Sequence, residues 1–449
     1  MLTFMRAQNF KSWKDTTELR LAPLTGFFGT NSSGKTSLLQ VLLLLKQTAE
    51  SSDRSLALNT EGLNADSEDR TNIATVSELI QRGSEHLQFH LRWDLPKHLD
   101  VKISRSSGSV TRQVKTLDFR TKISSSESGP RVDFFKYESK ELTAGMSFKS
   151  LDNYAVEATI DDQSLVQVQG RPFKKVSPPV KCYGFSDEAL RYYQDSGFLN
   201  DLVYSFETRM KNIYYLGPLR GYPKRQYPWG NGKVTDVGRK GENTIATILS
   251  SSTKEYKVDG KRNKVTLSER IAIWLKQMGM LESFRTQKIT ETFYQVLVKR
   301  HANSPEVLLP DVGFGVSQVL PVLALCYSAP TGSTIIFEQP EIHLHPLVQS
   351  YLADVFIDVI KNRQVQIIVE SHSEHLLRRL QRRIAEEEIS TDQTALYFCD
   401  SASEGSTIEP LKLDDYGNIT NWPRDFFGDI TGELISLTKA ALKRRANEN

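Results

Sequence analysis

Cysteine is scarce in this sequence, and long hydrophobic runs are absent. The three cysteines, Cys182, Cys326 and Cys399, lie far apart, which excludes a disulfide framework or a CxxC zinc site and fits a reducing compartment. The longest apolar stretches, residues 41–45 and 319–327, are far shorter than the roughly 20 residues of a membrane-spanning helix. The N-terminus has no apolar core of a signal peptide. We therefore expect a soluble, cytoplasmic protein with no membrane partner.

An excess of charge of one sign is also absent. Lys and Arg number 57 against 54 Asp and Glu, which gives a formal net charge of +3. This balance excludes a globally basic nucleic-acid-binding protein but allows a local basic patch, so that DNA binding stays open. The 449 residues, 25% of them charged, have an ordinary globular composition. At about 150 residues per domain, this length suggests more than one domain.

A phosphate-binding motif is the strongest signal in the chain. Residues 29–36 read GTNSSGKT, which matches G-x-x-x-x-G-K-[ST] between an apolar β-like run and a helical segment. Backbone N–H groups of such a loop surround phosphates, its lysine supplies a charge, and its hydroxyl can bind Mg²⁺. The motif predicts an ATP and Mg²⁺ site in which Thr36 is a metal ligand. The expected nucleotide-binding residues are Asn31, Ser32, Ser33, Gly34, Lys35, Thr36 and Ser37.

The second half of this site is expected far downstream. Residues 333–338, STIIFE, form an apolar run that ends in a carboxylate, as a Walker B strand does, so Glu338 is the second predicted Mg²⁺ ligand. The segment EQPEIHLHP continues from Glu338. Residues 365–369 form another strand of buried type, and ESHS follows it.

These motifs carry a resemblance to a known group of proteins. GTNSSGKT, the NFKSW run before it, EQPEIHLHP and IVESHS resemble the ABC-type ATPase heads of the SMC, RecF and OLD group. Within that group, the sequence is similar to compact AAA-like ATPases of bacterial anti-phage defence operons. Residues 408–427 resemble an uncharacterised tail domain attached to such ATPases. The resemblance implies an ATP-sandwich homodimer in which residues 342–346 form the D-loop that contacts the partner subunit.

The resemblance also implies roles for single residues. His372 would be the switch histidine that senses the γ-phosphate. Ser317, in DVGFGVSQ, would belong to the signature that reaches the partner's nucleotide, although the usual Ser-Gly-Gly is missing and an ordinary glycine-rich helix start is the alternative. Trp13 would border the adenine, with a tryptophan of the core as the alternative.

One residue departs from the pattern of the group. The Walker B acid is normally followed by a glutamate that polarises the attacking water, but this chain has Gln339. An amide can orient water but cannot accept its proton. Either Glu341 serves as the base, or turnover is slow and ATP binding itself is the signal. We expect a weak ATPase with a long-lived ATP state. The predicted catalytic residues are Glu338, Gln339, Glu341 and His372.

Two other clusters allow different interpretations. Four of the eight histidines lie within residues 343–375, and a metal-dependent hydrolase is the alternative that they suggest, although no HExxH pattern occurs. Residues 220–229 mix bases with aromatic residues, a composition that can bind a phosphate backbone and stack on bases but also occurs in ordinary packed loops.

No nuclease motif of the Toprim, HNH or PD-(D/E)xK type is recognisable, and no long heptad array occurs. Together with the resemblance, this implies an ATP-binding, slowly hydrolysing homodimer that acts as a switch or scaffold for a separate effector, which we expect to be a nuclease. The alternatives are a RecF-like DNA-binding repair ATPase and a non-hydrolysing scaffold stabilised by ATP.

The expected fold is α/β, a P-loop NTPase of ABC-ATPase head type with a β-rich and helical insertion and a small C-terminal α+β tail domain. A β meander is predicted from residue 86 to about 169, and helices are predicted over 186–212 and 267–285. The expected domains are 1–95 and 291–400 for the two parts of the head, 96–290 for the insertion, and 401–449 for the tail.

Overall fold

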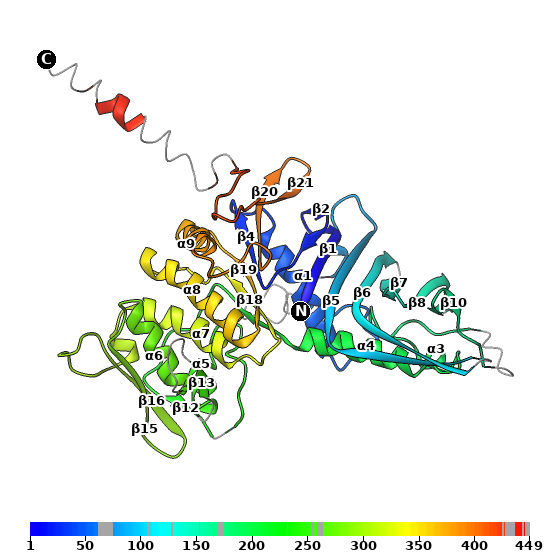
Figure 1. The fold of residues 1–449 in the computed structure, drawn as a ribbon, viewed down its shortest axis with the longest axis horizontal. Helices are drawn as coiled ribbons and strands as arrows, with labels where there is room; N and C mark the ends of the chain where they lie inside the picture. Colours follow the sequence, from blue (N-terminus) through cyan, green and yellow to red (C-terminus); the bar gives the residue numbers. More distant parts are fainter. Residues whose placement is uncertain are drawn as a thin grey trace.

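The computed structural model contains two large β-sheets and a smaller lobe (Figure 1). It describes residues 1–61, 75–105, 108–126, 129–151, 153–168, 175–230, 232–252, 255–257 and 264–423, together with Phe426, residues 436–441 and Arg444. Among the helices that it describes, none is long and apolar enough to cross a membrane.

A six-stranded sheet forms the centre of the molecule, in the order β11-β18-β19-β4-β20-β21. The first five strands are parallel, and β21 pairs antiparallel with β20. Every residue of β18 and β19 is buried, as expected for parallel strands covered on both faces. The bounds are β11 Ile213–Leu216, β18 Thr334–Glu338, β19 Gln366–Glu370, β4 Leu24–Gly29, β20 Thr394–Ala402 and β21 Gly405–Pro410.

Helices cover the two faces of this sheet. Helix α1 (Lys35–Glu50) contacts β4, β11 and β19 of the central sheet and β1 of the second sheet, so its apolar residues are buried on more than one side. Ile336 points into the core that contains α1, whereas its neighbours Ile335 and Phe337 belong to the core of α7, α8 and α9. The bounds of these three helices are Phe314–Ser328, Pro346–Arg363 and Glu374–Ala385.

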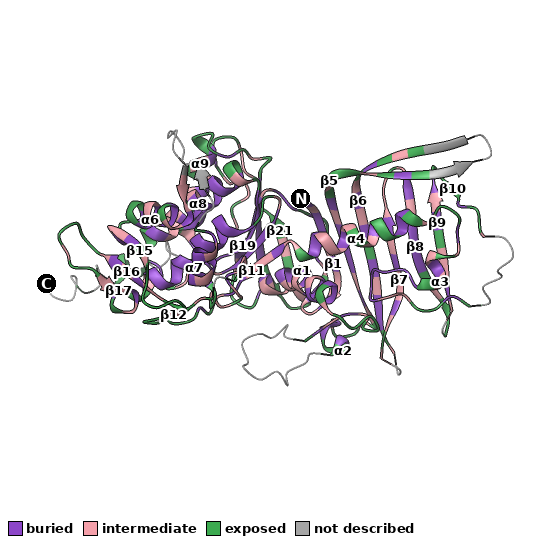
Figure 2. Cartoon of the chain, turned by 90° about the horizontal axis from the view of Figure 1, so that it is seen from below, coloured by how far each residue is buried: buried purple, intermediate pink, exposed green. Residues whose placement is uncertain are grey.

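The second sheet has nine strands and begins with the N-terminus of the chain. Consecutive antiparallel pairing from β5 to β10 confirms the predicted β meander. Figure 2 colours the buried residues of these strands purple, and many of them belong to one hydrophobic core. The strands are β1 Leu2–Phe10, β2 Trp13–Asp15, β3 Leu19–Arg20, β5 His86–Arg105, β6 Gly108–Ser126, β7 Gly129–Glu138, β8 Leu142–Ser150, β9 Asn153–Ile160 and β10 Gln163–Ser164.

Two predicted helices are shorter than the sequence suggests. The helix expected over 186–212 is split into α3 (Asp187–Leu190) and α4 (Gly197–Lys211). The helix expected over 267–285 ends at Gln277, because the chain turns there and enters strand β15 at Ser283. The start of this helix, α6 (Leu267–Gln277), is fixed by a capping box in which Thr266 and Glu269 bond to each other's backbone N–H groups.

Helix α2 (Val76–Leu79) adds Val76 and Leu79 to the core of the second sheet. The other elements form the small lobe around α6. They are β12 Tyr227–Pro228, α5 Thr244–Ser250, β13 Glu255–Lys257, β14 Lys264–Thr266, β15 Ser283–Lys288, β16 Phe293–Lys299, β17 Val307–Leu308 and the 3₁₀ helix η1 Leu309–Asp311.

The mixed α/β class predicted from the sequence is confirmed. The expected domain borders at residues 95 and 400 fall inside β5 and β20. The sequence also predicts a β hairpin within residues 405–449, but β21 pairs with β20, which precedes this range. The sequence further predicts a basic terminal helix, and its residues Lys443 and Arg445 lie outside the described residues.

Candidate nucleotide-binding site

The glycine-rich loop joins β4 to α1 and is held against the hairpin β20–β21. Gly29 has φ 136°, and a Cβ there would lie 1.9 Å from the carbonyl oxygen of Cys399. Gly34 has φ 85°, and its Cβ would lie 2.6 Å from Ser406 Oγ. Only glycine fits either position. The two glycines of the motif therefore let the loop pack on the tail segment as well as wrap around phosphate.

Lys35 lies within the curve of this loop. Its Nζ donates to the carbonyl oxygens of Gly29 and Thr30, at 3.2 and 2.5 Å, and to Ser33 Oγ at 3.2 Å. Burial lowers its pKa. Asn31 and Ser32 are exposed at the mouth of the loop, whereas Ser33 is buried. The ammonium group is thus in the place where phosphate oxygens would become its partners.

Two carboxylates meet the hydroxyl of Thr36 beside the loop. Thr36 Oγ1 lies 2.9 Å from Glu370 Oε2 and 3.5 Å from Glu338 Oε1. Glu338 and Glu370 are neighbours in register at the ends of β18 and β19, and Tyr215 donates its hydroxyl to Glu338 at 2.6 Å. Burial, reinforced by the nearby charge of Glu338, raises the pKa of Glu370 to about 7.

Sequence reasoning missed Glu370. The available signal was its place at the end of the strand over 365–369, because parallel neighbours bring such ends to one edge of a sheet. A hydroxyl and two carboxylates are hard oxygen ligands that fit Mg²⁺, which commonly uses one or two carboxylates and takes its other ligands from phosphate and water. Among the residues that the structure describes, no group of three or more His, Cys, Asp or Glu could hold a metal ion, so the histidine-based hydrolase gains no support.

Gln339 and Glu341 occupy different environments after the Walker B strand. Gln339 has φ 44°, and its N–H donates to the carbonyl oxygen of Glu370 at 2.9 Å. Glu341 Oε1 accepts hydrogen bonds from Ser371 Oγ at 2.8 Å and from the His372 N–H at 2.7 Å. Burial raises the pKa of Glu341. Through these two hydrogen bonds, Glu341 stabilises the segment that carries His372.

The predicted switch histidine lies next to the phosphate loop. His372 is half-buried and makes a hydrogen bond with the backbone of Gly29. Burial, with the nearby positive charge of Lys35, lowers its pKa, so the imidazole is neutral at physiological pH. A neutral imidazole can donate one hydrogen bond and accept another, which suits a sensor of phosphate.

Ser317 and Trp13 have structural roles within the chain. Ser317 is 7% exposed, and its hydroxyl donates to the carbonyl oxygen of Phe314 at 2.6 Å. The exposed start of helix α7 is formed instead by Gly313 and Phe314.

Trp13 is fully buried and donates its indole N–H to the Gly34 carbonyl oxygen at 3.0 Å. These contacts favour the alternative of a core tryptophan, which supports the loop from behind.

Aromatic contacts bring the candidate signature and the candidate D-loop together. The ring centroids of Phe314 and His343 are 5.5 Å apart, and those of Phe314 and Tyr222 are also 5.5 Å apart. Segments separated in sequence therefore share one surface, close to the start of α7.

The site combines a strand that ends in a glycine-rich loop, a helix that begins at the lysine of this loop, and acids at the ends of adjacent parallel strands. These features define a P-loop NTPase of ABC-ATPase head type. The chain belongs to the family described as AAA ATPase domain, which matches residues 1–91 and 206–377. Residues 389–437 match a second family, described as a protein of unknown function (DUF3696).

Three solved SMC head structures align with the chain. The SmcHead bound to the C-winged helix domain of ScpA has 11% identity and a TM-score of 0.49, over 92% of this chain and 98% of that one. The SMC head domain from Thermotoga maritima has 8% identity and a TM-score of 0.40, over 92% and 99%. The Smc head domain with an extended coiled coil, bound to the C-terminal domain of ScpA derived from Pyrococcus furiosus, has 10% identity and a TM-score of 0.43, over 92% and 96%. A search of curated proteins finds no match.

Proposed function

We propose that this protein is a slowly hydrolysing, ATP-dependent homodimeric switch that controls a separate effector protein. ATP binding is supported by the position of Lys35 in the glycine-rich loop and by the family to which the chain belongs. Mg²⁺ binding is supported by the hydroxyl of Thr36 and the carboxylates of Glu338 and Glu370, which meet at one point. When bound, Mg²⁺ supplies positive charge that offsets the charge of the phosphates.

The observation that carries the slow turnover is the environment of Gln339 and Glu341. Gln339 directly follows the Walker B acid, and its amide can orient a water but cannot take the proton. Glu341 is the nearest replacement in sequence, but one of its oxygens is already bonded to Ser371 and His372. Positioning and charge alone still permit some hydrolysis, so the ATP-bound state is long-lived rather than permanent.

Association of two copies is supported by apolar exposure beside the site. Large apolar residues are exposed in the loop that follows β11 (Tyr222), at the start of α7 (Phe314) and at the start of α8 (Leu347). Apolar groups that gather on one face commonly mark an interaction surface. The same face carries the candidate signature and D-loop, which in the resembling heads contact the partner's nucleotide.

The effector and the biological setting rest on the resemblance of the sequence motifs. EQPEIHLHP, IVESHS and the tail after residue 408 resemble ATPases of anti-phage defence operons. We infer that the effector is a nuclease, because the motifs of the chain account for ATP and not for strand cleavage. The setting is tested by the plaquing efficiency of phage on bacteria that express the chain with its neighbouring genes, with Lys35→Ala as the loss-of-binding control.

The biochemical proposal is tested by steady-state ATP turnover and by the molar mass in solution with and without ATP. We expect slow turnover in the wild-type protein, faster turnover in Gln339→Glu, none in Lys35→Ala, and a dimer that forms with ATP. Glu341→Gln tests whether Glu341 is the base, and we expect this variant to keep the slow rate within a few-fold. Fast turnover stimulated by double-stranded DNA in the wild-type protein would instead identify a DNA-clamping repair ATPase.

A further inference from the structure

A cavity of about 580 Å³ lies apart from the phosphate loop, between the loop after β11 and helix α7. None of its lining residues belongs to the glycine-rich motif or to the acidic pair of Glu338 and Glu370. Its volume lies in the range of roughly 300–1,000 Å³ that is typical of small-ligand sites. The residues that matter for its chemistry are Tyr222, Lys224, Tyr227, Lys240, Leu320 and Pro321.

The walls of this cavity are fixed by hydrogen bonds between the segments that form it. The Gly221 N–H donates to the carbonyl oxygen of Lys240 at 2.9 Å, and the Lys224 N–H donates to the Tyr227 hydroxyl at 2.8 Å. Gly241 has φ 72° and lies so close to α7 that a Cβ there would be 2.7 Å from Pro321 Cγ. The loop is therefore pinned to the helix, and the cavity is formed without a ligand.

Lys224, Lys240 and the carboxylate of Glu242 lie among the residues that line the cavity, which leaves it a net positive charge. Neither Lys224 nor Lys240 forms an ion pair with a carboxylate among the residues that the structure describes. Their neighbour Arg225 differs, because its guanidinium is paired with Asp311 at 2.8 Å. The charge of the two lysines is thus available to an anion such as a phosphate, to which lysine binds as a point charge.

Aromatic and apolar groups line the rest of the cavity. Tyr222 is 81% exposed, and its ring rests against that of Phe314 with 5.5 Å between centroids. Tyr227 is half-buried, and Leu320 and Pro321 form part of an apolar floor. Planar rings beside free cations are suited to a ligand that combines a flat, apolar-faced body with a negative group. An acidic peptide supplies the negative group but not the flat, apolar-faced body.

We propose that this cavity binds a nucleotide unit of single-stranded nucleic acid, with its base on Tyr222 and Tyr227 and its phosphate on Lys224 and Lys240. Stacking on tyrosine tolerates every base, so binding shows little sequence preference. Ser317, in the first turn of α7, also lines the cavity, which places the bound strand beside the candidate signature. The site goes beyond the ATP-dependent switch, and none of its lining residues belongs to the phosphate loop or to the pair of Glu338 and Glu370.

The test is fluorescence anisotropy with a dye-labelled short oligothymidylate and no ATP, on the full chain. Tyr222→Ala should weaken binding by about 5- to 100-fold, and Tyr222→Phe should restore it, because stacking uses the ring and not the hydroxyl. The double variant Lys224→Ala/Lys240→Ala should also bind more weakly and lower the salt slope by about 1.4, since each phosphate contact on a single strand contributes roughly 0.7. Lys233→Ala, which removes an exposed lysine of the same loop that does not line the cavity, is the matched control.

Further arms identify the source of the nucleotide and separate this site from the ATP site. Displacement of the oligonucleotide by thymidine monophosphate supports free nucleotides as ligands, and failure to displace it supports the single strand. Lys35→Ala must keep oligonucleotide affinity while it loses ATP binding. The proposal is overturned if the wild type does not bind, if Lys35→Ala binds as weakly as Tyr222→Ala, or if the cavity variants behave like Lys233→Ala. Binding of a fluorescent ATP analogue by Tyr222→Ala, by the double lysine variant and by Lys233→Ala shows that their fold and ATP site are intact.

Discussion

The hydroxyl of Thr36 donates a hydrogen bond to the carboxylate of Glu370, with 2.9 Å between Thr36 Oγ1 and Glu370 Oε2. The two residues are 334 positions apart in the chain. They meet because α1 begins beside the edge of the sheet at which β18 and β19 end. Glu370 is therefore a third candidate Mg²⁺ ligand beside Thr36 and Glu338, and the sequence motifs do not identify it.

We expect Glu370→Gln to weaken the dependence of ATP affinity on Mg²⁺. The amide cannot offer a charged oxygen to the ion, so the gain in ATP affinity on adding Mg²⁺ should fall by roughly 10- to 100-fold. Titration of a fluorescent ATP analogue in Mg²⁺ and in EDTA measures this gain. Glu374→Gln is the control, because its carboxylate pairs with Arg378 at 3.2 Å on the surface of α9. An equal effect of both variants would assign Glu370 to fold maintenance alone.

The same carboxyl predicts how the nucleotide-free protein responds to pH. Burial and Glu338 raise the pKa of Glu370 from 4.5 to about 7, against the opposing effects of Thr36 and Lys35. In that window the folded state binds more protons than the unfolded state, so stability falls as pH rises from 4.5 to about 7. Glu370→Gln removes this titration. In EDTA, we expect the Tm of Glu370→Gln to rise relative to that of the wild type as pH increases across this window. Above the window, the Tm difference should stay constant. A Tm difference that does not change with pH would contradict the prediction.

The parts of the site that the sequence predicts are those formed by contiguous residues. Lys35 and Thr36 are recognisable because their motif, strand and helix are adjacent in the chain. The strand over 334–338 is recognisable because parallel strands with both faces covered need continuous apolar residues. Helix 267–285 was predicted too long, since the local pattern does not reveal that residues 283–288 pair with β16.

Contacts between distant segments could not be predicted in this way. Glu370 becomes part of the site only through the register of two strands, and Glu341 Oε1 is engaged by hydrogen bonds from Ser371 and His372. The burial of Trp13 likewise depends on the second sheet and on the carbonyl group of Gly34. Periodicity identifies the elements, whereas these roles depend on tertiary packing.

The tail hairpin is expected to position the phosphate loop. Thr30 Oγ1 donates to Asp400 Oδ1 at 3.0 Å, and the loop packs against the backbone of β20. Asp400→Ala should raise the KM for ATP about fivefold and leave kcat nearly unchanged, because one hydrogen bond of this kind is worth on the order of 1 kcal/mol. Thr30→Val should have the same effect, and the double variant should add little to it.

Glu404→Gln is the control for this pair, because Glu404 is an exposed acid in the turn of the same hairpin. Steady-state kinetics over a range of ATP concentrations supply KM and kcat for the wild type, the two single variants, the double variant and the control. Additive effects of Thr30→Val and Asp400→Ala would show that the two residues act independently, against the prediction.

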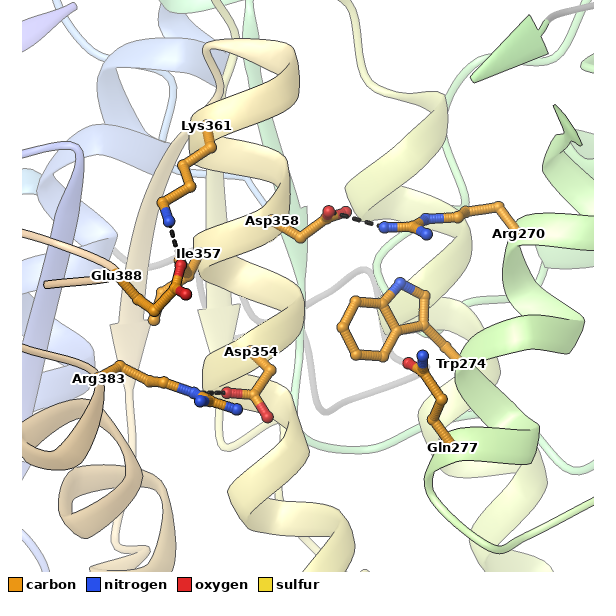
Figure 3. A pocket seen from close by; sticks show the side chains of 9 residues that line it. All are labelled: Arg270, Trp274, Gln277, Asp354, Ile357, Asp358, Lys361, Arg383 and Glu388. Atoms are coloured by element: carbon orange, nitrogen blue, oxygen red, sulfur yellow. Dashed lines mark hydrogen bonds and ion pairs between the residues drawn. The ribbon is translucent and has the colours of Figure 1, made fainter. Parts of the chain in front are cut away.

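The last prediction concerns the cavity of Figure 3, where α6 of the small lobe meets α8 of the head. Arg270 and Asp358 form a buried ion pair at 2.7 Å, with side chains 5% and 8% exposed. Tyr327 donates to the same carboxylate and accepts from the Trp274 indole N–H at 2.6 Å. Removal of one member leaves a buried charge without its counter-charge, which commonly costs about 3–5 kcal/mol. We therefore expect Asp358→Asn to lower Tm strongly.

Lys361→Ala is the matched control in the same cavity. Lys361 pairs with Glu388 near the surface, where both side chains are well exposed, 40% and 51%. Such exposed pairs contribute less than about 1 kcal/mol, so its Tm should stay close to that of the wild type. Because α6 belongs to the lobe and α8 follows the candidate D-loop directly, Asp358→Asn should also reduce ATP-dependent dimerisation below its new Tm. If Asp358→Asn lowers Tm but dimerises as the wild type does, the ion pair contributes to stability alone and has no role in coupling ATP binding to dimerisation.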